Sequence, residues 1–139
     1  MAQKEKPRYC LQCDDGAVLV REIKTITGDI DGEPYVVPDV AGWHCPVCGE
    51  IEFAQEDDSA QRVSDAISAA GAKARARRAG ELRANRKKLK LSQAEAGRLF
   101  GGGVSAFSEY ERGKTQPHKS TVLLLALLGK HPELLAELR

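Results

Sequence analysis

The stretch from Leu91 to Gly113, LSQAEAGRLFGGGVSAFSEYERG, limits most strongly what this chain can fold into. Ser92 and Glu95 have the spacing of a capping box, so a helix is expected to begin at Gln93. Three apolar side chains follow at helical spacing: Ala96, Leu99 and Phe100. The segment therefore predicts a short amphipathic helix with a defined start.

Three glycines, Gly101 to Gly103, are expected to end this helix, with Gly101 in the left-handed conformation of a C-cap. A second helix is expected from Val104 to Arg112, ending at Gly113. Its buried side chains are expected to be Val104, Phe107 and Tyr110. Gly97 has no side chain, so the two helices can approach closely. This pattern is typical of a DNA-reading helix-turn-helix, with an ordinary helical hairpin as the alternative.

The charge of the chain changes sign near residue 71. Residues 1–70 contain six Lys or Arg against fourteen Asp or Glu, a net charge of −8, whereas residues 71–139 contain fifteen against six, a net charge of +9. This asymmetry favours nucleic-acid binding by the second half alone. The basic residues before the helix pair can neutralise phosphates or form a solvated linker: Lys73, Arg75, Arg77, Arg78, Arg83, Arg86, Lys87, Lys88 and Lys90.

All four cysteines lie in the acidic half as two C-x-x-C pairs, Cys10 with Cys13 and Cys45 with Cys48. Four thiolates complete the tetrahedral coordination of Zn²⁺, so the spacing predicts one closed, structural zinc site per chain. The residues between the pairs are expected to form strands at 17–26, 35–37 and 40–43, with a hairpin turn at Asp31-Gly32.

Other uses of the cysteines are less favoured. Nothing suggests secretion, which argues against two disulfides, and a second symmetrical pair argues against a thioredoxin-like redox site. A catalytic zinc would leave one position open to water. His44 could replace a thiolate but is expected to face solvent, and Trp43 is expected to be the apolar anchor beneath the metal. No catalytic constellation is recognised, so no enzyme is expected.

A length of 139 residues allows two small domains. We expect a β-rich zinc-binding domain over residues 1–70, with a connecting helix near 56–70, a hinge or linker over 71–80, and an all-α helix-turn-helix bundle of about five helices over 81–139. The sequence of residues 71–80 is compatible with either a flexible hinge or a frayed helix. The predicted fold class is two-domain α+β. No apolar run could span a bilayer and the charged start does not resemble a signal peptide, so we expect a cytoplasmic protein without a membrane partner.

The C-terminal end is expected to hold two more helices. Ser120 can cap one that continues through Leu128, and Pro132 can open a short last one. Apolar residues cover nearly every side of the first: Val122, Leu123, Leu124, Leu125, Leu127 and Leu128. Because such a helix must be buried all round, the side away from the helix-turn-helix is expected to meet a second copy of the chain.

The residues from Leu91 to Gly113 resemble an Xre/Cro-type helix-turn-helix without a gap. Together with the cysteine pairs, the whole chain resembles the MqsA-type (YgiT-type) antitoxins. The most specific segments are Phe100-Gly101-Gly102-Gly103-Val104, Ala106-Phe107-Ser108, Gln116-Pro117-His118 and Lys130-His131-Pro132-Glu133-Leu134-Leu135.

This resemblance implies that the N-terminal domain binds a ribonuclease toxin of the MqsR type. It also implies that the C-terminal domain dimerises and represses its own operon through palindromic DNA. An N-terminal domain with a net charge of −8 would be attracted to a basic ribonuclease. Strands within 17–43 could also pair with the edge of the toxin's sheet. A stand-alone zinc-containing regulator with a sensing N-terminal domain is the alternative, and a thiol oxidoreductase with a DNA-binding tail is less favoured.

Seven residues are expected at the DNA surface: Gln93, Ser105, Ser108, Glu109, Arg112, Lys114 and Lys119. Gln93, Lys114 and Lys119 are expected to contact phosphates, and Ser105, Ser108 and Glu109 to lie nearest the base edges. The resemblance implies Asn and Arg as base readers where this chain has Ser105 and Glu109. The operator sequence therefore does not carry over from the family.

Overall fold

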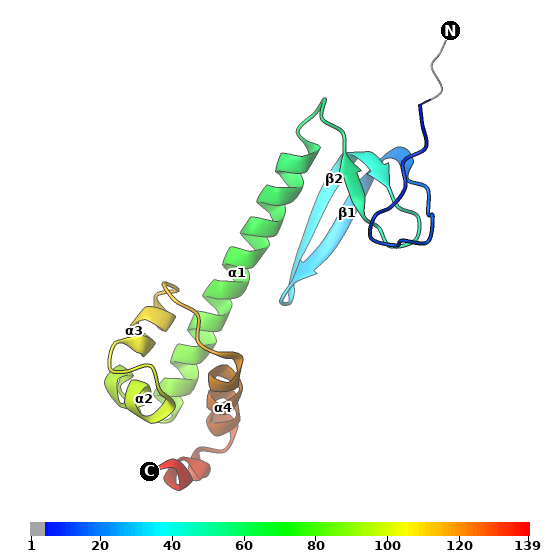
Figure 1. Cartoon of the computed structure of the whole chain (residues 1–139). Helices are drawn as coiled ribbons and strands as arrows, with labels where there is room; N and C mark the ends of the chain where they lie inside the picture. The colour runs from blue at the N-terminus through cyan, green and yellow to red at the C-terminus, as the bar shows by residue number, and fades with distance from the viewer. Residues whose placement is uncertain (1–4) are drawn as a thin grey trace. The chain divides into compact units, whose positions relative to one another are not determined.

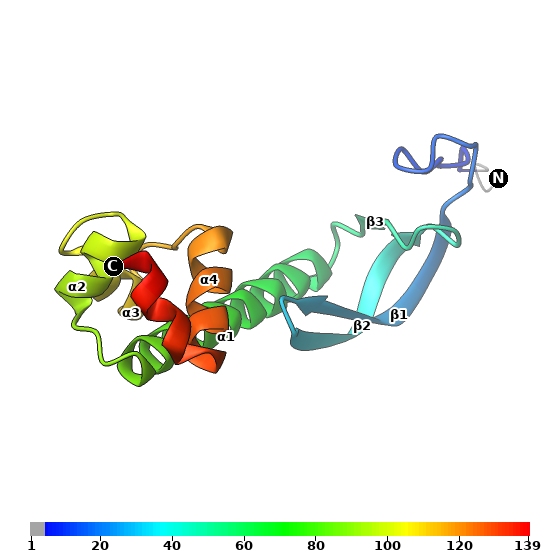
Figure 2. The same ribbon diagram turned by 90° about the horizontal axis from the view of Figure 1, so that it is seen from below.

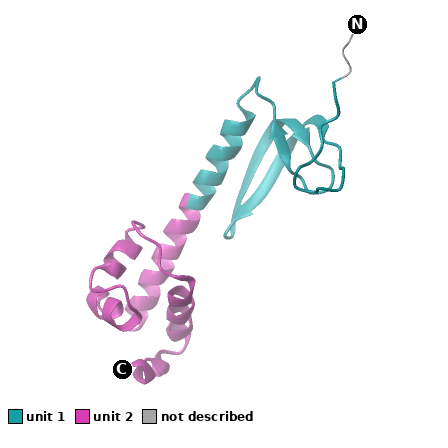
Figure 3. Ribbon diagram, viewed as in Figure 1, with its two compact units in different colours: residues 1–71 teal, residues 72–139 magenta. Residues whose placement is uncertain are grey.

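The computed structural model of the chain describes residues 5–139. It divides into two compact units, residues 1–71 and 72–139 (Figure 3). The elements are β1 (Val20–Ile30), β2 (Glu33–His44), β3 (Ile51–Phe53), α1 (Ser59–Lys88), α2 (Gln93–Phe100), α3 (Ala106–Glu111), α4 (Lys119–Lys130) and a 3₁₀ helix η1 (Pro132–Leu138), as Figures 1 and 2 show. An antiparallel sheet followed by five helices confirms the predicted α+β fold class.

Unit 1 is built on a three-stranded antiparallel sheet in the order β1-β2-β3. Asp31 and Gly32 join β1 to β2 and both have positive φ, 53° and 88°. Two such residues suit the type I′ turn, whose twist matches that of the strands it joins. The Gly32 amide also donates a hydrogen bond to Asp29 Oδ1 at 2.7 Å. The predicted hairpin turn is therefore confirmed.

The segments 35–37 and 40–43 belong to one strand, β2, although two strands are expected from the sequence. The register against β1 shifts between Lys24 and Ile26, and Asp39 has a φ of 53°. An extra residue at such a bulge bends the strand without ending it. As a result Val37 and Val40 are both buried, at 4% and 0% exposure, in one cluster with Val63 of α1.

The first turn of α1 is fastened to β2 by polar contacts. Ser59 is fully buried, and its Oγ accepts a hydrogen bond from the Ala41 amide at 2.9 Å. The Arg62 guanidinium donates to the carbonyls of Pro38 and Asp39 at 2.6 and 2.9 Å. The two bonds from Arg62 satisfy the carbonyls of Pro38 and Asp39, which have no partner residue in the β1–β2 register.

Helix α1 runs for 30 residues and includes residues 71–80, for which the sequence leaves a hinge or a frayed helix open. Gly71 and Gly80 are both within the helix, and neither has the positive φ that would interrupt it. The residues around them are mostly Ala, Lys and Arg, which favour helix. The connecting helix expected near 56–70 begins at Ser59.

Unit 2 packs its helices around one apolar core: Leu82, Leu89, Leu91, Ala96, Phe107, Leu125, Leu128 and Leu135. Helix α2 begins at Gln93 with the predicted capping box, in which Ser92 and Glu95 exchange hydrogen bonds of 2.7 and 3.1 Å. A Cβ at Gly97 would lie 2.0 Å from the carbonyl oxygen of Gly103. The close approach expected at Gly97 is therefore made by the backbone of the turn.

Three details of unit 2 differ from expectation. Helix α3 starts at Ala106, so Val104 lies in the preceding turn and is 61% exposed where burial is predicted. Helix α4 starts at Lys119, one residue before the predicted cap. The last helix is of the tighter 3₁₀ type. Within residues 5–139, no helix is both long enough and apolar enough to cross a membrane.

Candidate metal centre and DNA-binding surface

The four cysteines come from two short loops of unit 1. Cys10 and Cys13 lie in a loop closed by the Tyr9–Val18 bridge, and the Cys10 amide donates to the Ala17 carbonyl at 2.8 Å. Cys45 and Cys48 lie in the turn between β2 and β3. Gly16 and Gly49 follow the two pairs with φ values of 80° and 78°, a conformation that glycine adopts without steric cost.

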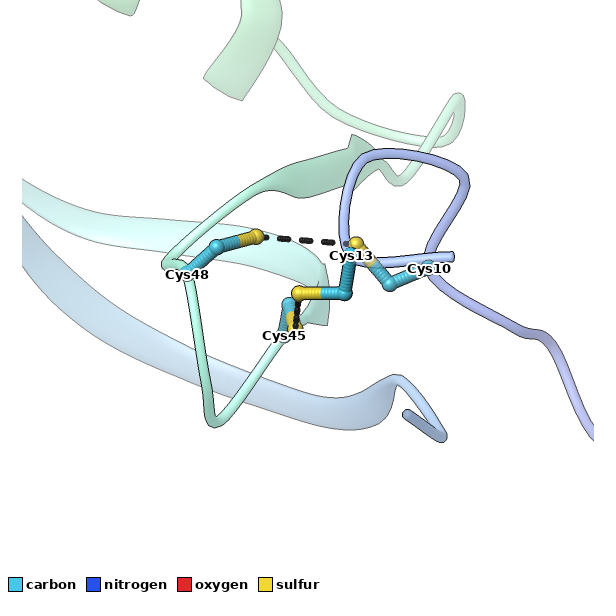
Figure 4. Close-up of side chains that lie close together, drawn as sticks. All are labelled: Cys10, Cys13, Cys45 and Cys48. Carbon is cyan, nitrogen blue, oxygen red and sulfur yellow. Dashed lines mark hydrogen bonds between the residues drawn. The ribbon is translucent and has the colours of Figure 1, made fainter. Parts of the chain in front are cut away.

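The two loops bring all four sulfur atoms within 4.8 Å of one another. Cys10 Sγ lies 3.5 Å from Cys48 Sγ, and Cys13 Sγ lies 3.7 Å from Cys45 Sγ. Figure 4 shows the four side chains directed toward one another from the two loops. Sulfurs at the corners of a tetrahedron around a metal at about 2.3 Å lie about 3.8 Å apart. The cluster therefore fits a four-thiolate metal site.

Backbone amides in the loop of Cys45 and Cys48 donate hydrogen bonds that stabilise thiolates. The amides of Val47 and Glu50 donate to the sulfurs of Cys45 and Cys48 at 3.4 and 3.5 Å. The Cys48 amide lowers the pKa of Cys45 to about 6, whereas a hydrogen bond with the Cys48 side chain raises the pKa of Cys13. Four crowded sulfurs resist ionising together, so a bound cation favours the deprotonated cluster.

Trp43, predicted from the sequence to be an apolar anchor beneath the metal, is half-buried and stacks with two guanidinium groups. Arg8 Cζ lies 3.8 Å and Arg21 Cζ 4.7 Å from the ring centroid. Arg8 also pairs with Glu52, and Arg21 with Glu56 at 2.7 Å. Because Arg8 and Trp43 each precede a cysteine pair by two residues, this stack ties the two loops together.

His44 does not face solvent, so that expectation is wrong. Its side chain is 1% exposed, and Nε2 lies 3.2 Å from the Val40 carbonyl oxygen. Its Nδ1 is buried without a hydrogen-bond partner among residues 5–139, and the imidazole is outside the four-sulfur cluster. The alternation of side chains along β2 explains the burial, since His44 lies on the same face as Val40 and Gly42.

The expected base-contacting residues lie on or just before α3. Ser105, the residue before α3, is exposed, whereas Ser108 and Glu109 are half-buried. The Glu109 carboxylate has no ion pair within residues 5–139. Arg112 is exposed, and its Nε donates to the Ser108 carbonyl at 3.1 Å. The expected phosphate contacts Lys114 and Lys119 are exposed as well.

Gln93 has an intramolecular partner that sequence reasoning missed. Its Nε2 donates to Glu111 Oε2 at 2.8 Å, and the same carboxylate receives two hydrogen bonds from Arg86, at 2.5 and 3.1 Å. Arg86 also donates to the Leu91 carbonyl at 2.8 Å. The side chains of Arg86 and Glu111 are only 10% and 5% exposed, so Arg86 is not a free phosphate ligand.

This network joins the end of α1, the start of α2 and the end of α3. Burial opposes ionisation of Glu111, but hydrogen bonds from Arg86 and Gln93 outweigh it and lower the pKa of the carboxyl group. Arg86 and Glu111 are 25 residues apart, and no local pattern in the sequence connects them. The network fixes the three helices that form the expected DNA surface.

Comparison with known proteins identifies the family of the chain. A family model described as MqsA, the antitoxin component of bacterial toxin-antitoxin systems, matches residues 8–139, a span that includes all four cysteines and the helix-turn-helix segment. The protein named antitoxin MqsA of Escherichia coli (strain K12) is 40% identical over 130 residues, which cover 94% of this chain and 98% of that protein. The chain therefore belongs to the MqsA family, the antitoxin component of bacterial toxin-antitoxin systems.

Proposed function

We propose that this antitoxin neutralises a ribonuclease toxin of the MqsR type through unit 1 and represses its own operon through unit 2. The observation that carries this division is the separation of charge, with −8 on residues 1–70 and +9 on residues 71–139. An acidic domain attracts an RNA-binding enzyme, and a basic one attracts DNA. Membership of an antitoxin family favours this function over a stand-alone regulator.

The metal that we propose for the cysteine cluster is Zn²⁺, one per chain and structural. Four thiolates with amide hydrogen bonds to two of them are typical of closed zinc sites, and zinc brings no redox chemistry of its own. Cys10, Cys13, Cys45 and Cys48 would hold it. Unit 1 has a small apolar cluster, so metal binding would supply much of the folding free energy of its loops.

For toxin binding we propose the outer face and free edge of the β1–β2 hairpin. The sheet order leaves β1 at an edge. Side chains alternate between the two faces of a strand, so Val36 lies on the face opposite its buried neighbour Val37. Ile23 lies on that same outer face, because it pairs with Ala41, whose neighbour Val40 is buried in the core. Their exposures are 63% and 65%. Exposed apolar side chains beside an unpaired edge are typical of strand-addition sites.

Replacement of Ile23 tests this surface in the full-length chain. The partner is the product of the adjacent reading frame, expected to be a ribonuclease of about 100 residues. Ile23→Arg puts a positive charge against a basic enzyme and should weaken binding by about a hundredfold in a titration. Ile67→Arg, at an exposed isoleucine of α1, is the matched control and should bind as tightly as wild type. Unchanged binding by Ile23→Arg would exclude this face.

For unit 2 we propose a homodimer that presents α3 of each chain to one half-site of a palindrome. The exposed leucines of α4 supply a dimer surface, since Leu123 and Leu127 are 58% and 49% exposed. Lys114 and Lys119 would contact phosphates, together with exposed basic side chains of α1 such as Lys73, Arg75 and Lys87. The affinity for DNA should therefore fall steeply as the salt concentration rises.

A further inference from the structure

The turn between α2 and α3 exposes one large apolar side chain. Val104 is 61% exposed, and among residues 72–139 the other exposed large apolar side chains all lie on α4 or η1. Its neighbour Ser105 is exposed and precedes α3. Val104 thus stands apart from the leucines proposed for the dimer and lies beside the residues proposed to face DNA.

The glycines of the turn explain why Val104 points outward. Gly101, Gly102 and Gly103 have φ values of 96°, 91° and 85°, a conformation that carries the backbone across α2 at Gly97. After the turn, the interior positions are filled by Ala106 and Phe107, which are 7% and 0% exposed. Val104 therefore contributes little to the core, and no packing requirement explains a valine at this position.

We infer that Val104 contacts the C5-methyl group of a thymine in the operator and thereby determines specificity at that base pair. The inference rests on the proposed DNA binding by unit 2. Among the groups that base edges present in the major groove, the thymine methyl is the apolar one, and small apolar side chains contact it. Valine cannot form hydrogen bonds, so it distinguishes thymine from bases that lack this methyl group.

Uracil substitution tests this contact because it removes only the methyl group. The probe is a duplex that the full-length protein selects from a random-sequence pool, with each thymine replaced in turn by uracil. At one position per half-site, uracil should weaken wild-type binding by about three- to fivefold. Val104→Ala should weaken binding to the thymine duplex by a similar factor. The variant protein should therefore bind the thymine and uracil duplexes with equal affinity.

The matched control is Ile67→Ala, the truncation to alanine of an exposed apolar side chain in unit 1 that belongs to neither proposed binding surface, and it should leave both affinities unchanged. Wild-type protein that binds every uracil duplex as tightly as the parent would overturn the inference while leaving DNA binding intact. The inference would also be overturned if Val104→Ala lowered the affinity for the thymine duplex and for the uracil duplex by the same factor. If the protein selects no sequence from the pool, the proposed operator binding is refuted, and the inference about Val104 is refuted as well.

Discussion

At the scale of single residues, the ion pair between Arg86 and Glu111 is a buried interaction that links α1 to α3 in unit 2. Removing one partner of a buried pair leaves the other charge unpaired, which costs about 3–5 kcal/mol. We therefore expect Glu111→Gln to lower the free energy of unfolding by roughly that amount in urea titrations. Glu81→Gln removes an exposed carboxylate paired with Arg77 and should cost less than about 1 kcal/mol. Equal costs for the two changes would contradict the structure.

The same pair predicts a pH dependence. The pKa of Glu111 is lower in the folded chain than its ordinary value, so its contribution to stability is present above the unfolded pKa of about 4.3. That contribution is lost as the pH falls from there through the folded pKa. The difference in unfolding free energy between wild type and Glu111→Gln should therefore shrink on acidification below about pH 4.3. A difference that stays constant down to acid unfolding would contradict this assignment.

At the scale of elements, the continuity of α1 can be tested with glycine. Gly80 is helical and has no atom within 4 Å of an added Cβ, so Gly80→Ala should stabilise the chain by about 0.5–1 kcal/mol. Gly97→Ala is the opposite case, since its Cβ would meet the Gly103 carbonyl oxygen at 2.0 Å, and it should destabilise. Thermal unfolding measures both. No stabilisation by Gly80→Ala would indicate that residues 71–80 are a flexible hinge.

The exposed side of α4 carries the prediction about assembly. Leu123 and Leu125 lie two residues apart, yet Leu123 is 58% exposed and Leu125 is fully buried. If a second copy covers Leu123, Leu123→Lys should convert the dimer to a monomer in sedimentation experiments without lowering helix content. Val36→Lys, in unit 1, should leave the dimer unchanged. Wild-type protein that sediments as a monomer at micromolar concentration would refute the homodimer.

The sequence predicts those elements whose position depends on residues close together in the chain. The capping box placed the start of α2 at Gln93, and Asp31-Gly32 placed the hairpin turn. The four-cysteine cluster followed from residue type and spacing alone. Burial of His44 was missed because a predicted strand does not reveal which face meets the core. The single strand β2 was missed because its bulge depends on pairing with β1.

At the scale of the whole molecule, opposite charges on the two units support two separable binding functions. The acidic unit holds the cysteine cluster and the proposed toxin surface, and the basic unit holds α2, α3 and the proposed DNA surface. Each unit has an apolar cluster of its own. Loss of the cysteine cluster should therefore impair toxin binding by unit 1 and leave DNA binding by unit 2 intact.

Parallel titration of the full-length Cys45→Ser variant with the cognate toxin and with the selected operator duplex measures whether the two functions are separable. Cys45 is 1% exposed within the cluster, so its loss should abolish zinc binding and toxin binding. Operator affinity should stay within about threefold of wild type. Val47→Ser, at an exposed residue of the same loop, is the control and should keep zinc and both partners. Cys45→Ser protein that retains tight toxin binding, or that no longer binds the operator, would show that the two functions are not divided between the units in this way.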